Sequence, residues 1–290
     1  MQPFTYERPT TAEAAVARLA AGGARVLAGG TDLIPQLREG RRSARVVVDV
    51  KYIPELGSIG RTPDGGWRIG AAASVQALGG VVAFAAEHRA LLDSARLIGS
   101  LQIQSRATLG GNLCNAAPSG DAVPLLVSLG AMAEIAGPRG RRTIAAERLA
   151  AGPGRTSLDA GELLVAVQLP PRTAGHAAKY LRFTPRREMD IAIAGSGVAI
   201  GVDDSGEIMS ARITLASVAP VPLRAAKAEA RLLGNRPNAA LLLEAGQIAA
   251  GEAQPISDTR GSADYRRELV AVLTRRALEA CCTELGVALA

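Results

Sequence analysis

Two separate Gly-Gly pairs, each flanked by small residues, constrain this sequence more than any other feature. The chain reads VLAGGTDL over 26–33 and TLGGNLCNAAPSGD over 108–121. Glycine reaches positive φ and allows close backbone approach, and consecutive backbone N–H groups in a turn can surround a diphosphate. In the first stretch Thr31 and Asp32 follow the glycines and open a helix, whose N-terminus also favours an anion. Two turns converging on one diphosphate would need no P-loop lysine, and neither stretch matches GxGxxG or GxxxxGK[ST].

From the residues alone, each pair also fits an ordinary tight turn. Asp121 equally suits a plain helix N-cap, and Asp32 equally suits a first-turn carboxylate favoured by the helix dipole. Cys114 suggests a reactive thiol, but we interpret it as a small buried apolar residue.

Composition excludes several classes of function. Hydrophobic residues make up 48% of the 290 residues, enough for the cores of two domains. No apolar run is long enough to span a membrane and the first residues lack a signal pattern, so a cytoplasmic protein is expected. Three cysteines and two histidines cannot supply an iron–sulfur cluster or a zinc site, so redox chemistry would need an organic cofactor. The net charge is +6, but arginines are scattered and aromatics are 3%, so no nucleic-acid binding is expected.

The order of periodic segments predicts an α+β fold of two domains. Helices and strands alternate up to about residue 172, which is typical of an α/β domain. Its predicted elements are helices over 12–20 (capped by Thr10 or Thr11), 32–40, 75–88, 90–100 and 122–130, and strands over 24–28, 46–50, 67–73, 131–137 and 161–170. Three strand-like runs (178–185, 191–203, 207–218) then precede three helical ones (223–234, 238–252, 262–286). This second part predicts a three-stranded antiparallel sheet covered by helices. The predicted domains are therefore 1–172 and 177–288.

The two glycine stretches, AGGTDL and ATLGGNLCNAAPSGDAVPLLVSLGA, resemble the flavin-binding medium subunit of molybdenum hydroxylases. That family includes carbon monoxide, quinoline and nicotine dehydrogenases and the flavin domain of xanthine dehydrogenase. RFTPRREMDIAIAGSGVAI (182–200) and ISDTRGSADYRRELVAVLTRRAL (256–278) match in the expected order, so the resemblance spans nearly the whole chain. It implies FAD held between two subdomains of an N-terminal PCMH-type domain. A C-terminal domain like that of the carbon monoxide dehydrogenase flavoprotein would follow.

The resemblance also implies which residues contact FAD. Asp121 matches a cofactor-contacting carboxylate, Leu164 a strand residue beside the isoalloxazine, and Ile98 a residue beside the cofactor in some members. Arg182 stands where the family usually has Lys, so a cationic flavin contact is kept. Gln104 and Ser105 depart from the family pattern and receive no role. No catalytic residue and no metal ligand is expected in this chain. The residues expected along the diphosphate are Val26, Leu27, Ala28, Gly29, Gly30, Thr31, Asp32 and Leu33 in the first stretch, and Thr108, Leu109, Gly110, Gly111 and Asn112 in the second.

The implied function is electron relay within a larger enzyme. A large molybdopterin subunit would hydroxylate the substrate, and a small subunit with [2Fe–2S] clusters would pass electrons to this chain's FAD. The FAD would deliver them to an external acceptor: NAD, oxygen, a quinone or a cytochrome. The implied assembly is a dimer of heterotrimers, and the substrate stays open among carbon monoxide, an N-heteroaromatic ring and an aldehyde. The alternatives are a self-contained flavin oxidase, which the scarcity of Tyr, Trp and His disfavours, and a non-enzymatic FAD-binding module.

Overall fold

The chain folds into two compact units that are interleaved in sequence. The computed structural model describes residues 1–186 and 189–289. The first unit comprises Met1–Glu87, Ile98–Ala116 and Ala131–Pro171, and the second comprises His88–Leu97, Ala117–Gly130 and Arg172–Ala290. Two short segments from the first half of the chain thus belong to the second unit. The sequence domains 1–172 and 177–288 stay a prediction.

The first unit begins with a small parallel sheet in the order β1-β3-β2. Its central strand is buried at all four residues, as the apolar run at 46–50 predicts. The first helix begins after Thr11, whose side chain accepts a hydrogen bond from the Ala14 N–H, which confirms the predicted cap. The elements are β1 (Thr5–Glu7), α1 (Ala12–Ala20), β2 (Ala24–Leu27), α2 (Leu33–Arg38) and β3 (Val46–Asp49).

The first unit also contains a five-stranded sheet in the order β4-β5-β10-β6-β7, with every pair antiparallel, and a two-stranded sheet of β8 and β9. The predicted helix over 75–88 is two helices, because Gly79 and Gly80 interrupt it. The elements are η1 (Val50–Tyr52), α3 (Pro54–Gly57), β4 (Ile59–Arg61), β5 (Trp67–Gly70), α4 (Val75–Gly79), α5 (Val82–Glu87), α7 (Leu101–Gln104), α8 (Leu109–Asn115), β6 (Met132–Gly137), β7 (Gly140–Ala145), η2 (Ala146–Arg148), β8 (Ala150–Gly152), β9 (Arg155–Thr156) and β10 (Leu163–Leu169).

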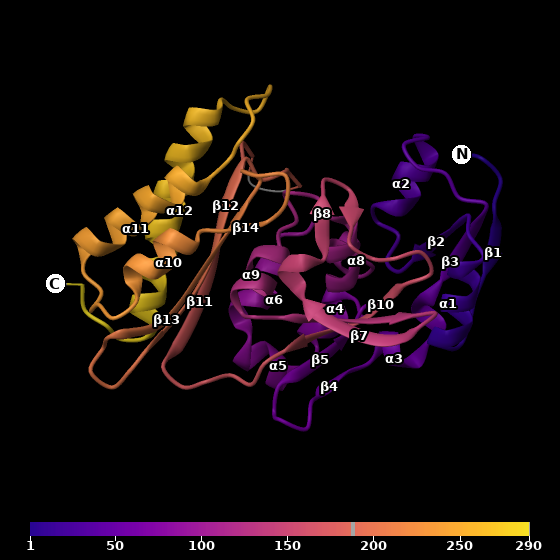
Figure 1. Ribbon diagram of the computed structural model, residues 1–290, viewed down its shortest axis with the longest axis horizontal. Helices are drawn as coiled ribbons and strands as arrows, with labels where there is room; N and C mark the ends of the chain where they lie inside the picture. The colour runs from indigo at the N-terminus through magenta and orange to yellow at the C-terminus, as the bar shows by residue number, and fades with distance from the viewer. Residues whose placement is uncertain (187–188, 290) are drawn as a thin grey trace. The chain divides into compact units, whose positions relative to one another are not determined.

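The second unit contains the predicted antiparallel sheet, in the order β11-β12-β13-β14, in which the fourth strand has only two residues. Within this unit α12 packs on β11 and β12, and α11 packs on α12 (Figure 1). The elements are α6 (Arg89–Ala95), α9 (Val123–Ser128), β11 (His176–Phe183), β12 (Ala194–Val202), β13 (Ile208–Ala216), β14 (Leu223–Arg224), α10 (Ala226–Leu232), α11 (Ala239–Glu252) and α12 (Ala263–Glu284).

Strand β12 is covered on both faces, which explains its run of small and apolar residues. The Ser196 hydroxyl accepts a hydrogen bond from Thr274 of α12 at 2.9 Å. The next residue, Gly197, faces α9, where an added Cβ would lie 2.8 Å from the Pro124 Cβ. Successive residues of a strand point to opposite faces, so α12 and α9 lie on opposite sides of this sheet.

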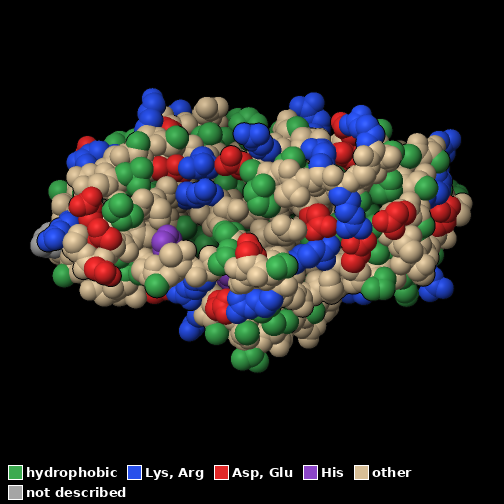
Figure 2. Space-filling view, turned by 60° about the horizontal axis from the view of Figure 1, so that its bottom comes forward, with side chains coloured by type: hydrophobic (Ala, Val, Ile, Leu, Met, Phe, Trp, Pro, Cys, Tyr) green, Lys and Arg blue, Asp and Glu red, His purple; other side chains and the backbone are tan. Residues whose placement is uncertain are grey.

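Charges of both signs are mixed on the surface. On the face shown in Figure 2, Lys and Arg side chains are interspersed with Asp and Glu. In the first unit, for example, Arg141 pairs with Glu55 at 2.8 Å and with Glu134 at 2.9 Å. Among the described residues, no helix has both the length and the apolar character needed to cross a membrane.

Candidate functional site

A pocket of about 680 Å³ lies within the first unit; we call it the main pocket. Its wall combines the turn between β2 and α2, the beginning of α8, and the segment from 154 to 164. This volume is typical of small-molecule and cofactor sites. The predicted residues that line it are Val26, Ala28, Gly29, Gly30, Thr31, Asp32, Leu33, Ile98, Thr108, Gly110, Gly111, Asn112 and Leu164.

Four predicted residues lie elsewhere. Leu27 packs against the small cluster of Leu37, Ala44 and Val47, because strand alternation turns it away from the side of Val26 and Ala28. Leu109 is buried in the core. Asp121 and Arg182 belong to the second unit.

The two glycines of the first stretch serve different purposes. A Cβ on Gly29 would lie 2.0 Å from the Arg106 carbonyl oxygen, so the turn packs directly on the backbone that leads to Thr108. Gly30 has a φ of +80°, a conformation that L side chains rarely adopt. Its carbonyl oxygen accepts the Ile34 N–H at 3.1 Å, which begins α2. The expected order of strand, glycine turn and helix is therefore confirmed.

The second stretch is a helix start rather than a tight turn, so that expectation was wrong. The Thr108 hydroxyl accepts the Gly111 N–H at 2.8 Å and caps α8. Gly111 is not among the residues with positive φ. A Cβ on Gly110, by contrast, would lie 2.5 Å from the Ala71 carbonyl oxygen. Glycine at position 110 therefore permits close packing of α8 against Ala71. The first N–H groups of a helix have no intrahelical acceptor, so the start of α8 can offer hydrogen-bond donors to a ligand.

Two acidic groups of the main pocket, Asp32 and Cys114, favour their neutral forms more than free side chains do. Burial raises the pKa of Asp32, although the charge of Arg41 opposes this. Burial also raises the pKa of the Cys114 thiol to about 12. A neutral thiol at physiological pH is a poor nucleophile, which supports the packing interpretation of Cys114.

A buried polar cluster joins Asp121, Tyr180 and Arg182 in the second unit. One Asp121 oxygen accepts from Arg182 Nη1 at 2.5 Å, and the other accepts from the Tyr180 hydroxyl at 3.1 Å. Desolvation raises the pKa of Asp121 to about 6, against the effect of Arg182 and of both hydrogen bonds. Asp121 does not cap α9, whose N-cap is Ala122, so the simple N-cap alternative was wrong. Residues 187–188 of the matching stretch 182–200 lie outside the described residues.

Sequence reasoning missed several residues of the main pocket. They include Arg25, Gln36, Arg42 and the segment 154–163. Gln36 follows Asp32 by four residues at the start of α2, and this spacing was a usable signal. The segment 154–163 carries no motif, and only the fold brings it to the pocket.

The donor set and shape of the main pocket fit a dinucleotide diphosphate. Added Cβ atoms on Gly29 and Gly110 would collide with the carbonyl oxygens of Arg106 and Ala71, and Gly30 has a positive φ, so glycine allows the elements of this wall to pack closely. Small residues let phosphate oxygens approach backbone N–H groups closely.

Comparison with known proteins gives consistent matches over nearly the whole chain. Residues 2–172 match the family described as the FAD binding domain in molybdopterin dehydrogenase, and residues 179–281 match the carbon monoxide dehydrogenase flavoprotein C-terminal domain. The chain is 35% identical to the carbon monoxide dehydrogenase medium chain of Afipia carboxidovorans, over 95% of this chain and 96% of that one. It is 32% identical to a putative xanthine dehydrogenase FAD-binding subunit of Escherichia coli, over 97% of each chain.

Solved structures agree with these sequence matches. A crystal structure of the Cu,Mo-CO dehydrogenase superposes with a TM-score of 0.92 at 34% identity, over 98% of this chain and 99% of that one. Quinoline 2-oxidoreductase from Pseudomonas putida 86 gives a TM-score of 0.91 at 26% identity, over 98% of each chain.

Proposed function

Because this chain belongs to the family of FAD-binding subunits of molybdenum hydroxylases, we propose that it relays electrons through one FAD held non-covalently in the main pocket. The observation that carries the proposal is the packing of the Gly29–Gly30 turn on the backbone before Thr108, which forms one wall from both glycine stretches. A bound flavin supplies the redox chemistry, and the protein supplies binding and tuning.

The residues of this chain would act by position and charge. The backbone around Gly29, Gly30 and Gly110 would surround the diphosphate. Ile98 and Leu164 would offer apolar surface to the ring system. Asp121 and Arg182 are proposed flavin contacts on the grounds of family resemblance, and their mutual ion pair keeps both buried charges compensated.

The proposed partners are a small [2Fe–2S] subunit and a large molybdopterin subunit, arranged as a dimer of heterotrimers in the cytoplasm. Support comes from relatives that are medium chains or subunits, among them those of carbon monoxide dehydrogenase and nicotine 6-hydroxylase. The electrons would arrive from the [2Fe–2S] clusters and leave to an external acceptor.

Comparison of the isolated chain with the reconstituted complex tests this proposal. The isolated, FAD-loaded chain should be bleached by dithionite yet be inactive toward carbon monoxide, N-heteroaromatic rings and aldehydes. Hydroxylation with an added acceptor dye should appear only when the two partner chains are present. Turnover of an organic substrate by this chain alone would instead favour the self-contained oxidase.

A further inference from the structure

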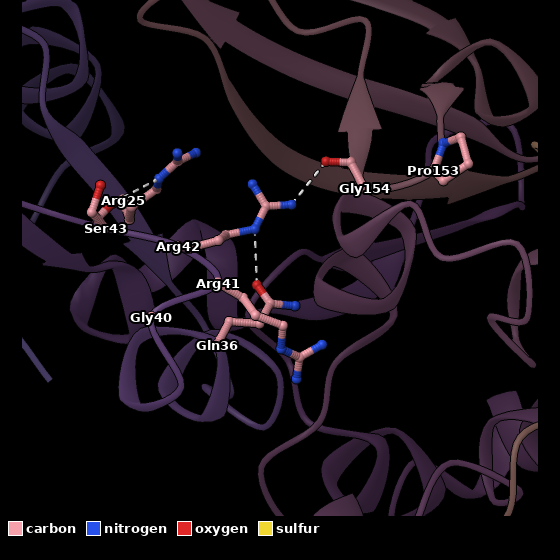
Figure 3. Close-up of a pocket in the computed structure, with 8 residues that line it drawn as sticks. All are labelled: Arg25, Gln36, Gly40, Arg41, Arg42, Ser43, Pro153 and Gly154. Carbon is pink, nitrogen blue, oxygen red and sulfur yellow. Dashed lines mark hydrogen bonds between the residues drawn. The ribbon is translucent and has the colours of Figure 1, made fainter.

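A second pocket, of about 460 Å³, adjoins the main pocket in the first unit. Three arginines (Arg25, Arg41 and Arg42) line it together with Gln36 and the turn at 153–154 (Figure 3). We call it the arginine pocket. Because Arg25, Gln36 and Arg42 also line the main pocket, the two cavities share a wall. No acidic residue is among the described residues that line the arginine pocket.

Two of these guanidinium groups are oriented by neutral acceptors. Arg42 donates from Nε to Gln36 Oε1 at 2.9 Å and from Nη2 to the Gly154 carbonyl oxygen at 2.8 Å. Arg25 donates from Nε to the Ser43 carbonyl oxygen at 3.3 Å. In residues 1–186 and 189–289, neither has a carboxylate within ion-pair distance. Neutral acceptors fix the direction of a guanidinium without cancelling its charge.

Arg41 is the exception among the three, because its Nη2 lies 2.5 Å from Glu39. Glu39 does not line the arginine pocket, however. Elsewhere in the same unit, arginines with buried stems are compensated directly, as Arg68 is by Glu134 at 2.8 Å. In the described residues, Arg25 and Arg42 therefore bring to the arginine pocket positive charge that no ion pair compensates.

The neighbouring positive charges of Arg25 and Arg42 are unfavourable to each other. Desolvation and the neighbouring charge of Arg42 lower the pKa of the Arg25 guanidinium. Like charges held near one another repel, and an anion placed between them reverses the sign of the interaction. Among the described residues, Nη1 of Arg42 and both Nη atoms of Arg25 donate no hydrogen bond, so these atoms can bind such an anion.

We propose that the arginine pocket binds the phosphate group of a small anion, at a site separate from the glycine stretches. The planar guanidinium fork matches pairs of phosphate oxygens, which makes arginine well suited to bidentate phosphate binding. The lining offers no aromatic ring for a base, so the phosphate itself would be recognised. Inorganic phosphate and a phosphate monoester share this chemistry. The proposal does not depend on the flavin, because it rests on this pocket alone.

Calorimetric titration of the full chain with inorganic phosphate, at constant ionic strength set with chloride, tests the proposal. Loss of a hydrogen bond between charged groups is worth about 1.5–3 kcal/mol, so Arg42→Gln should weaken phosphate binding about 10- to 100-fold. Arg25→Gln should also weaken phosphate binding. Because the Arg25 side chain is exposed, this variant is expected to fold. Arg38→Gln is the matched control, because Arg38 is an exposed arginine at the end of α2 that does not line the arginine pocket.

Further arms identify the source of the phosphate. Binding of AMP but not adenosine supports a phosphate monoester, and binding of inorganic phosphate alone supports the free ion. Equal phosphate affinity in wild type and both arginine variants would overturn the proposal. So would phosphate that competes with FAD equally in all variants, because the anion would then occupy the cofactor's own site. If the wild-type chain bound phosphate but did not bind FAD, the result would count against the proposed function and not against the phosphate site.

Discussion

A Cβ atom built on Gly29 would lie 2.0 Å from the carbonyl oxygen of Arg106, so these two backbones are in direct contact. Gly29 belongs to the first glycine stretch, and Arg106 comes just before the second. The contact places the turn after β2 on the chain segment that begins α8. It explains physically why the chain carries both stretches, since one wall of the main pocket is built from them together.

Gly29→Ala is expected to disrupt this wall. The colliding atom is a backbone carbonyl, which cannot rotate away, so overpacking should lower the free energy of unfolding by about 1–3 kcal/mol or more. FAD affinity should fall as the wall moves. Urea unfolding measures the first effect. Gly57→Ala is the control, because a Cβ there meets nothing within 4 Å. Wild-type stability for Gly29→Ala would contradict the observed contact.

Neighbouring glycines in α8 should respond differently. At Gly110 an added Cβ would lie 2.5 Å from the Ala71 carbonyl oxygen, whereas at Gly111 its nearest neighbour is Thr108 Oγ1 at 3.0 Å. Alanine is also favoured over glycine inside a helix by about 1 kcal/mol. Gly110→Ala should therefore lower the thermal midpoint, while Gly111→Ala should leave it nearly unchanged. Equal losses in the two variants would show that the second stretch is a strained turn.

The buried Asp121 predicts a specific pH dependence. Its folded-state pKa of about 6 is above the ordinary value of 3.8, so the folded state holds the proton more tightly than the unfolded state. Its contribution to stability is therefore greatest below about pH 4 and is lost as pH rises through about 6. Two pKa units correspond to about 3 kcal/mol at most. Asp121→Asn should remove this loss.

Urea unfolding of wild type and Asp121→Asn between pH 4 and pH 7 measures the effect. The stability of the variant relative to wild type should increase over this range. Asp204→Asn is the control for the substitution itself, because Asp204 is exposed and forms no ion pair with the other described residues. A difference that stays constant with pH would argue against desolvation of Asp121.

The cysteines are expected to be unreactive in the folded chain. Burial raises the pKa of Cys114 to about 12 and raises the pKa values of Cys281 and Cys282 above that of a free thiol. Because the thiolate is the nucleophile, alkylation by iodoacetamide at pH 8 should be at least about 100-fold slower than in urea. Mass spectrometry locates the label. Rapid labelling of native Cys114 would restore the reactive-thiol interpretation.

Local patterns predicted the elements whose signals are local. The Thr11 cap marked α1, and the apolar run at 46–50 marked β3. Strand β7, with the sequence GRRTIA, was missed because it is largely exposed and lacks an apolar face. Its hairpin with β6 helps to make the second sheet of the first unit antiparallel.

The site was predictable only where a motif carried it. The glycine stretches indicated most of the main pocket. The pairing of Asp121 with Arg182 depends on tertiary structure, because 61 positions separate them and no periodicity links a loop to β11. Arg25 and Arg42 were missed for the same reason, since the Gly154 carbonyl oxygen that orients Arg42 lies 112 positions away.

The most direct test of the central claim is to titrate the apo chain with FAD and, separately, with FMN. Quenching of flavin fluorescence measures the binding in each titration. If the two glycine stretches hold a diphosphate, FAD should saturate at a single equivalent and FMN should bind at least about 100-fold more weakly, a difference of about 3 kcal/mol. Equal affinity for FMN and FAD, or no saturable flavin binding, would contradict the account.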